Sequence, residues 1–296
     1  TFKEDRLKGQ GFFKKPAMVG TLNKELTQVV TILNMACRDL DWIPRVPRIR
    51  HVKGPSKDPY PITYEEQERL FSKLPTGWDV GAALFAVNTG VRKSELFGLK
   101  WSHKVNLSWM EDGKEVETFV FILSDTKNGE DRAVICNSVA RRVIDHMRNA
   151  RKMWRREIMR LESWLADGTL TGVAAKRART RVEGRRRALR SGLVFPSATG
   201  LRITSVAKVF NKAWKEAGLP TDKLLKCGIH NLRHTFGHRL RAAGVPDEDR
   251  DALLGHAKKN LTQHYATPDI QRLQAMAERV VERRETVVLR SIRSAI

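Results

Sequence analysis

Helical periodicity dominates this sequence, and its longest example lies between Val139 and Leu165. Apolar residues recur there three or four positions apart, which places them on one stripe of a single long helix. The stripe consists of Val139, Val143, Met147, Ala150, Trp154, Ile158, Leu161 and Leu165. The pattern breaks at Asp167-Gly168, and a second, arginine-rich stretch follows. These features predict a helical hairpin over about residues 141–190.

A second segment, residues 116–136, has the alternation of β-strands. The alternating apolar residues are Val116, Phe119, Phe121 and Leu123 on one side of a turn and Ala133 and Ile135 on the other. Asn128-Gly129 lies between them, and such a pair suits the type I′ turn of a hairpin. Helices are expected to begin at Thr63, to run from Thr204 to Ala217, and to cover residues 270–281. We therefore predict an α/β fold, mainly α-helical with a small antiparallel sheet.

The N-terminal part of the chain differs from the rest in composition. Residues 1–19 lack periodicity and are expected to be loop or the remnant of an element. Apolar residues from Leu22 to Leu40 follow helical spacing, with Thr21 as N-cap. Five prolines between residues 44 and 61 then indicate a linker. The predicted divisions are a small helical unit at 1–50, a linker at 51–61, a main domain at 62–285 and a tail at 286–296.

Charge is the unusual feature of the composition. The chain has 55 Lys and Arg residues against 33 Asp and Glu, a net charge of +22. This balance favours a polyanionic partner, nucleic acid first. No apolar run approaches the roughly 18 residues of a membrane span, so a membrane role is not expected. The three cysteines are widely spaced and indicate reduced thiols of a cytosolic protein. Because the sequence starts at Thr1 with neither a signal peptide nor an initiator methionine, we expect a fragment.

The stretch from His230 to Tyr265 collects residues suited to phosphate chemistry. It contains His230-Asn-Leu-Arg233, then Leu254-Gly255-His256, and then Tyr265 nine residues past His256. A guanidinium, an imidazole and a phenolic hydroxyl form a working set for attack on a phosphodiester. Each residue alone has an ordinary structural explanation, so the order and spacing carry the argument.

Two further candidates lie upstream. Thr89-Gly90-Val91-Arg92 precedes a predicted helix, and Glu95 follows Arg92 by three residues. Such an arginine–glutamate pair is most often a solvated ion pair when it occurs alone. Lys127 lies next to the predicted hairpin turn, where a lysine is usually just exposed. Neither position is assigned a function by its local sequence.

Taken together, the pattern resembles the tyrosine recombinases, also called phage-type integrases. The shared motifs are H-x-x-R, L-G-H with a tyrosine nine residues later, and T-G-x-R-x-x-E-L-x-x-L, and they cover about residues 60–285. The resemblance implies a recombinase catalytic domain preceded by part of a helical core-binding domain that clamps DNA. It also implies a catalytic set of Arg92, Lys127, His230, Arg233, His256 and Tyr265, with Glu95 as a supporting carboxylate.

The implied reaction is cleavage and rejoining of DNA strands through a 3′-phosphotyrosyl intermediate on Tyr265. The two arginines stabilise the phosphate, Lys127 acts as general acid, His256 donates to the phosphate, and His230 donates or acts as base. The expected protein is a site-specific recombinase or integrase of a phage or other mobile element. A chromosome or plasmid resolvase, a topoisomerase IB-like enzyme and a DNA-binding protein without catalysis are the alternatives.

No cofactor or metal is expected. His230, His234 and His238 recur every four residues, but no carboxylate ligand accompanies them. The expected partner is double-stranded DNA at attachment or recombination sites, bound by a homotetramer. Accessory DNA-bending and directionality proteins are possible partners, and the expected location is the nucleoid in the cytoplasm of a bacterial host.

The predicted helical hairpin departs from the usual length of the family. Residues 141–190 contain 16 Lys and Arg against 5 Asp and Glu, which gives this segment a net charge of +11. A DNA-backbone contact, a contact between protomers and a solvated embellishment are the competing interpretations. The candidate DNA contacts are Arg151, Lys152, Arg155, Arg156, Lys176, Arg177 and Arg179.

Overall fold

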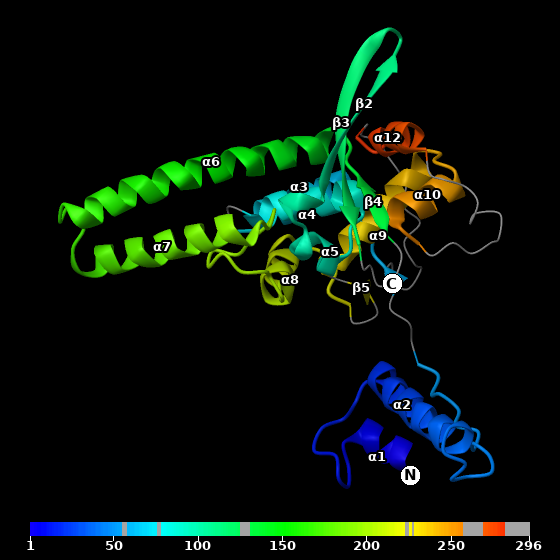
Figure 1. The fold of residues 1–296 in the computed structure, drawn as a ribbon. Helices are drawn as coiled ribbons and strands as arrows, with labels where there is room; N and C mark the ends of the chain where they lie inside the picture. The colour runs from blue at the N-terminus through cyan, green and yellow to red at the C-terminus, as the bar shows by residue number, and fades with distance from the viewer. Residues whose placement is uncertain are drawn as a thin grey trace. The chain divides into compact units, whose positions relative to one another are not determined.

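The computed structural model describes residues 1–54, 58–75, 78–124, 131–222, 225–226, 228–256 and 269–281 (Figure 1). Lys127, Tyr265 and the predicted tail at 286–296 lie outside these ranges. The chain divides into two compact units, Thr1–Lys57 and Asp58–Ile296, and the division falls within the predicted linker.

The first unit contains helices α1 (Phe2–Lys8) and α2 (Val19–Arg38). For residues 1–19 we expected a loop or the remnant of an element, and α1 contradicts the loop alternative over Phe2–Lys8. A capping box between Thr1 and Glu4 starts this helix without any apolar periodicity. Helix α2 begins after Met18 and not after Thr21. Only the first two apolar residues of the predicted α2 face, Leu22 and Leu26, are buried.

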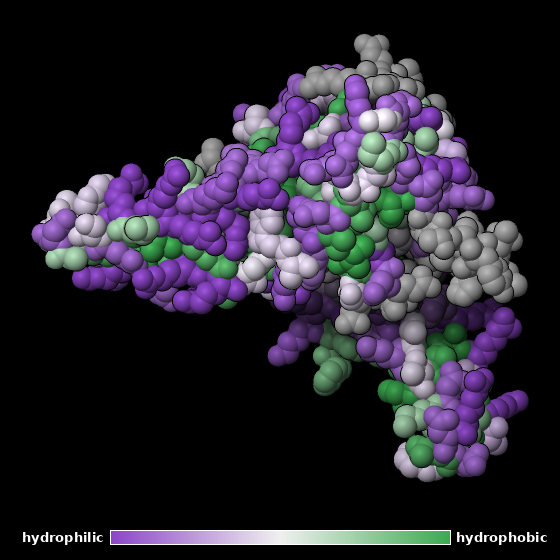
Figure 2. Space-filling model, turned by 45° about the horizontal axis from the view of Figure 1, so that its top comes forward, coloured by the Kyte–Doolittle hydropathy of each residue, from purple (hydrophilic) through white to green (hydrophobic). Residues whose placement is uncertain are grey.

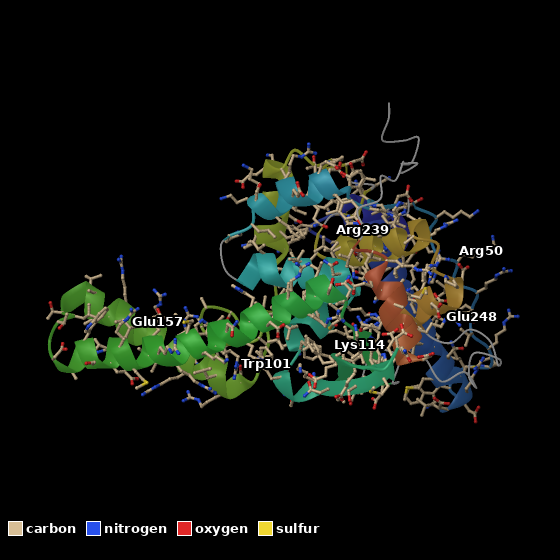
Figure 3. All side chains as sticks on the ribbon, turned by 90° about the horizontal axis from the view of Figure 1, so that it is seen from above. Arg50, Trp101, Lys114, Glu157, Arg239 and Glu248 are labelled. Atoms are coloured by element: carbon tan, nitrogen blue, oxygen red, sulfur yellow. The ribbon has the colours of Figure 1, made fainter. Side chains whose placement is uncertain are left out.

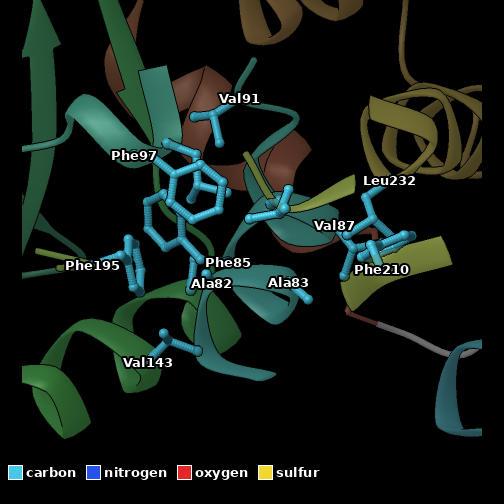
Figure 4. Packing of buried hydrophobic residues seen from close by; sticks show 14 of the residues in the cluster. Ala82, Ala83, Phe85, Val87, Val91, Phe97, Val143, Phe195, Phe210 and Leu232 are labelled. Atoms are coloured by element: carbon cyan, nitrogen blue, oxygen red, sulfur yellow. The ribbon is translucent and has the colours of Figure 1, made fainter. Parts of the chain in front are cut away.

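Helix α4 (Trp78–Thr89) lies in the core of the second unit. Its described side chains are mostly apolar on all sides of the helix, which is typical of a buried helix. It packs against α6 and α9. Its buried side chains include Phe85 and Val87, and Figure 4 shows them among residues of neighbouring elements. Helix α3 (Tyr64–Ser72) precedes it and starts at the predicted N-cap Thr63, whose side chain accepts a hydrogen bond from the Glu66 amide.

The sheet has three antiparallel strands in the order β2–β3–β4. Their bounds are β2 (Lys104–Glu111), β3 (Lys114–Leu123) and β4 (Arg132–Ile135). The pairing of β3 with β4 confirms the predicted strand pair, whereas β2 was not predicted. Strands β2 and β3 are joined at Asp112-Gly113, both with positive φ, and form the long ribbon in Figure 1. The predicted turn at Asn128-Gly129 lies outside the described residues.

Helices α6 (Ser138–Ala166) and α7 (Gly172–Ser191) form the predicted helical hairpin, which we call the arm (Figure 1). Buried side chains such as Ile158 and Val182 lie on the facing sides of its helices. Glu157 of α6 pairs with Arg181 and Arg185 of α7 at 2.7 and 3.2 Å. The visible face of the arm in Figure 2 is mainly hydrophilic.

The remaining elements complete the second unit. Their bounds are α5 (Lys93–Gly98), η1 (Trp101–His103), α8 (Ala207–Glu216), α9 (His230–Ala242), α10 (Asp247–Leu254), α12 (Ile270–Glu278), and the parallel strand pair β1 (Asp58–Pro59) and β5 (Leu225–Lys226). Helix α12 buries Leu273 and Ala277 in a cluster with Phe236 and Leu253, so its apolar face is covered within its own unit. In the described parts of the chain, no helix combines the length and apolar composition needed to cross a bilayer.

Candidate active site

Arg92 follows a turn whose geometry requires glycine. Helix α4 ends at Thr89, and Gly90 has a φ of 64°. A Cβ atom at Gly90 would lie 2.6 Å from Phe236 Cδ1 and 2.9 Å from Leu254 Cδ2, closer than real side chains approach. Helices α9 and α10 therefore pack directly against this turn, and Arg92 follows it as the N-cap of α5.

Glu95 orients the Arg92 side chain. The Glu95 carboxylate accepts hydrogen bonds from the backbone amide and from Nη1 of Arg92, both at 2.8 Å. Burial by itself raises the pKa of Glu95, but the charge of Arg132 and the hydrogen bonds from Arg92 outweigh it, so the pKa lies below its usual value. Glu95 is therefore an ionised anchor for Arg92.

The L-G-H segment meets Arg92 at the end of α10. Arg92 Nη2 donates to the carbonyl oxygen of Gly255 at 2.9 Å, and Gly255 ends α10 with a φ of 62°. The next residue, His256, places Nδ1 2.7 Å from Asp251 Oδ1, and its backbone amide donates to the Asp251 carbonyl. The Asp251 carboxylate therefore holds the half-exposed His256 ring, one residue past the Gly255 carbonyl that Arg92 binds.

Arg233 approaches from helix α9 and is almost completely buried. Its Nη1 donates to the carbonyl oxygen of Gly90 at 2.7 Å, in the turn that precedes Arg92. Burial, followed by the positive charges of Arg132 and Arg92, lowers the pKa of Arg233 to about 10, although Glu95 opposes the shift. The guanidinium stays protonated at neutral pH, and with Arg92 and Arg132 it forms a cluster of cations suited to an anion, here called the arginine cluster.

A third arginine, Arg132, belongs to this cluster and was not predicted. It opens strand β4, and its Nη2 lies 3.3 Å from Glu95 Oε2. Its Nη1 donates to the carbonyl oxygen of Leu254. The only sequence signal was an arginine at the start of an apolar strand.

His230 is the first residue of α9 and lies one turn before Arg233. Its ring packs edge-on against that of His234, with 5.1 Å between the centroids. Burial, then the charges of Arg241 and Arg239, lowers the pKa of His238. Across the ranges that the structure describes, no group of three His, Cys, Asp or Glu side chains is arranged to hold a metal ion.

The structure separates the candidate DNA contacts on the arm into two kinds. Arg151 donates to the carbonyl oxygens of Ala188 and Leu189 at 3.3 and 3.2 Å, so it joins α6 to the end of α7. Its guanidinium also lies 5.8 Å from the ring centroid of Trp101, which is labelled near the base of the arm in Figure 3. The other six candidates are exposed and have no acidic partner among the described residues: Lys152, Arg155, Arg156, Lys176, Arg177 and Arg179.

Residues 61–272 match the phage integrase family. A tyrosine recombinase XerC-like protein from Caldanaerobacter subterraneus subsp. tengcongensis is 25% identical over 201 residues. That match covers 62% of this chain and 44% of the relative, so the chain spans less than half of the relative's length.

Solved structures of the Tn1549 transposon integrase share the fold. One, in complex with circular intermediate DNA, has a TM-score of 0.53 and 18% identity, with 88% of this chain and 79% of the other covered. Another, in complex with transposon right end DNA, has the same TM-score and identity, with 90% and 81% covered. The chain belongs to the phage integrase family, the tyrosine recombinases, and its second unit has the fold of their catalytic domain.

Proposed function

We propose that this chain is the catalytic part of a site-specific DNA recombinase, an integrase of a phage or other mobile element. The observation that carries the proposal is the joining of three distant segments at one cluster of arginines. Arg92 is tied to Gly255 and Arg233 to Gly90, so both guanidiniums and His256 gather around two glycine turns. A phosphodiester suits such a cluster because guanidinium pairs bind its nonbridging oxygens.

The proposed reaction forms one bond and breaks one bond at phosphorus. The Tyr265 hydroxyl oxygen attacks the phosphorus, the bond to the 5′ oxygen breaks, and a 3′-phosphotyrosyl link results. His230 accepts the phenolic proton, and Lys127 protonates the departing 5′ oxygen. The exchange changes no oxidation state, so it needs no redox partner, and attack by a 5′-hydroxyl reverses it. The arginine guanidiniums, and not a metal ion, are proposed to neutralise the phosphate charge.

The residues of the arginine cluster and His256 are proposed to stabilise the charge that grows during this step. Arg92 and Arg233 donate to the nonbridging oxygens, and His256 donates to the same phosphate. Glu95 keeps Arg92 in place without contacting the substrate. Hydrogen bonds to backbone carbonyls already orient both guanidiniums before DNA arrives, so their reorganisation costs little during the reaction.

The proposed partner is double-stranded DNA at attachment sites, bound by a homotetramer with accessory DNA-bending and directionality proteins, in the nucleoid of a bacterial cell. Binding to DNA is supported by the net charge of +22 and by the DNA complexes of the similar Tn1549 integrase. Among the alternatives, a topoisomerase IB-like enzyme is less favoured by the L-G-H and H-x-x-R motifs. A resolvase is less favoured because the arm is large.

The arm is proposed to contact the DNA backbone. Its helices are held together by an apolar seam and by Arg–Glu pairs. After these internal pairs are formed, six exposed cations still lack an acidic partner among the described residues. Phosphates supply the missing negative charge, and such contacts strengthen binding without reading sequence.

Covalent capture tests the proposed function. A nicked duplex bearing the end of the element is incubated with the chain in EDTA and separated on a denaturing gel. We expect a protein–DNA adduct with the wild-type chain and none with Tyr265→Phe, although both bind the duplex equally. Binding without any adduct would contradict the proposal.

A further inference from the structure

Arg132 occupies an unusual position for an arginine at the start of a strand. Its side chain is only 8% exposed. A Cβ atom built on Gly255 would lie 2.5 Å from Arg132 Cδ, so the arginine packs directly on that glycine. Gly255 separates Leu254 from His256 in the L-G-H segment, which means that Arg132 covers the turn immediately before His256.

Arg132 and Arg92 hold neighbouring parts of the same turn. Arg132 Nη1 donates to the Leu254 carbonyl, and Arg92 Nη2 donates to the Gly255 carbonyl at 2.9 Å. Glu95 lies between the two guanidiniums, with one oxygen 2.8 Å from Arg92 Nη1 and the other 3.3 Å from Arg132 Nη2. The carboxylate, two guanidiniums and two consecutive carbonyls thus close a ring of contacts.

This ring joins three segments of the chain that carry predicted catalytic residues. Arg92 stands at the start of α5, His256 follows α10, and Arg132 begins β4, the strand reached five residues after Lys127. Loss of Arg132 removes one of the two guanidiniums that form ion pairs with Glu95, and it removes a donor from the Leu254 carbonyl. The first change loosens Arg92, which binds the Gly255 carbonyl, and the second frees the Leu254 carbonyl, so both affect the same turn.

We propose that Arg132 is a positioning residue of the strand-cleavage reaction: through Glu95 and the Leu254 carbonyl it fixes the Arg92 guanidinium and the turn that presents His256. The inference rests on the proposed function. In the proposed reaction Arg132 does not contact the scissile phosphate, so its loss affects the cleavage rate more than DNA affinity.

The pH dependence of cleavage distinguishes a positioning role of Arg132 from a purely structural one, because positioning acts through the charge of Glu95. The charged groups facing Glu95 are Arg92 from its own helix, Arg132 from β4 and Arg233 from α9. His256 and Asp251 lie at the end of α10, beyond Gly255. Burial raises the pKa of Glu95 when Arg132 no longer opposes it. In Arg132→Gln, Glu95 therefore becomes protonated at a higher pH than in the wild-type chain. Because cleavage needs ionised Glu95, the variant should lose activity at pH values where the wild-type chain is still active.

The experiment measures single-turnover cleavage of the nicked duplex by the full chain between about pH 8 and about pH 5, as a ratio to wild type. We expect Arg132→Gln to cleave about 100-fold more slowly, with affinity changed less than about threefold, and the ratio to fall further at low pH. Arg132→Lys should recover part of the rate, since it keeps the charge opposite Glu95. Adding Glu95→Gln to Arg132→Gln should remove the extra pH dependence.

Arg202→Gln is the matched control. Arg202 Nη2 donates to the carbonyl oxygen of Ser94 at 2.8 Å, in the helix α5 that also carries Glu95, but Arg202 does not pair with Glu95. It should leave the pH profile unchanged. An Arg132→Gln rate equal to wild type, or a pH-independent loss in both Arg132→Gln and Arg132→Lys, would overturn the inference. If the wild-type chain itself forms no adduct, the proposed function fails instead, so the two failures are distinguishable.

Discussion

Arg92 Nη2 donates to the carbonyl oxygen of Gly255 at 2.9 Å, across 163 positions of sequence. This contact places the first arginine motif against the L-G-H segment, so that two motifs recognised separately in the sequence lie together. The Arg233 contact with the Gly90 carbonyl does the same for the H-x-x-R motif. Backbone carbonyls, and not side chains alone, thus set the spacing of the cationic groups.

Arg233→Lys should make DNA cleavage depend on pH in the neutral to alkaline range. Burial and the charges of Arg132 and Arg92 already lower the pKa of Arg233 to about 10, and lysine starts from a lower pKa of about 10.4 than arginine. A cation whose pKa is lowered loses its charge as pH rises, so the variant should be most active at low pH. Single-turnover cleavage rates measured across pH check this, with wild type as reference. A pH-independent loss would contradict it.

Gly90→Ala should lower the free energy of unfolding by about 2–4 kcal/mol. The cost combines a positive φ with overpacking against Phe236 and Leu254. Gly113→Ala is the control, because Gly113 also has a positive φ, of 74°, but nothing lies within 4 Å of its added Cβ. Urea unfolding of both variants should give a clearly larger loss for Gly90→Ala, and equal losses would contradict the packing argument.

Neutralising unpaired arm cations should flatten the salt dependence of DNA binding. For Arg155→Gln/Arg156→Gln, the slope of log K against log salt should fall by about 0.9 for each phosphate that the variant no longer neutralises. Arg181→Gln/Arg186→Gln removes the same charge from residues paired with Glu157 and Glu162, so its slope should change less. Identical slopes in both double variants and wild type would exclude backbone contact at Arg155 and Arg156.

Arg151→Gln should act on stability and not on the salt slope. Its guanidinium donates to two carbonyls at the end of α7, and loss of these bonds should cost about 1–3 kcal/mol of unfolding free energy. Thermal or urea unfolding measures the loss, and DNA binding at several salt concentrations measures the slope. A reduced slope with unchanged stability would instead make Arg151 a phosphate contact.

Local sequence determined much of the fold and of the arginine cluster. The seam from Val139 to Leu165 and the break at Asp167-Gly168 predicted the arm, because helix pairing follows from the spacing of apolar residues. Thr63 predicted the start of α3 because a hydroxyl side chain caps a helix locally, and the structure adds a capping box with Glu66. The motif arginines and His256 were identified by short spacings, and the structure brings them together.

The missed features are of two kinds. Strand β2 could have been predicted, because Val105, Leu107 and Trp109 alternate with polar residues and Asp112-Gly113 is a usable hairpin signal. Arg132 was missed because its partner, the Leu254 carbonyl, lies 122 positions away. No local pattern identifies a buried arginine on a strand whose partner is a backbone carbonyl at the end of a distant helix.

Mapping the covalent link in the trapped complex tests the tyrosyl mechanism itself. The adduct formed in EDTA is digested with protease and nuclease, and mass spectrometry locates the modified residue and the DNA end. We predict a 3′-phosphate joined to Tyr265. A link on another residue, a 5′-phosphate link, or an adduct that persists in Tyr265→Phe would contradict this mechanism.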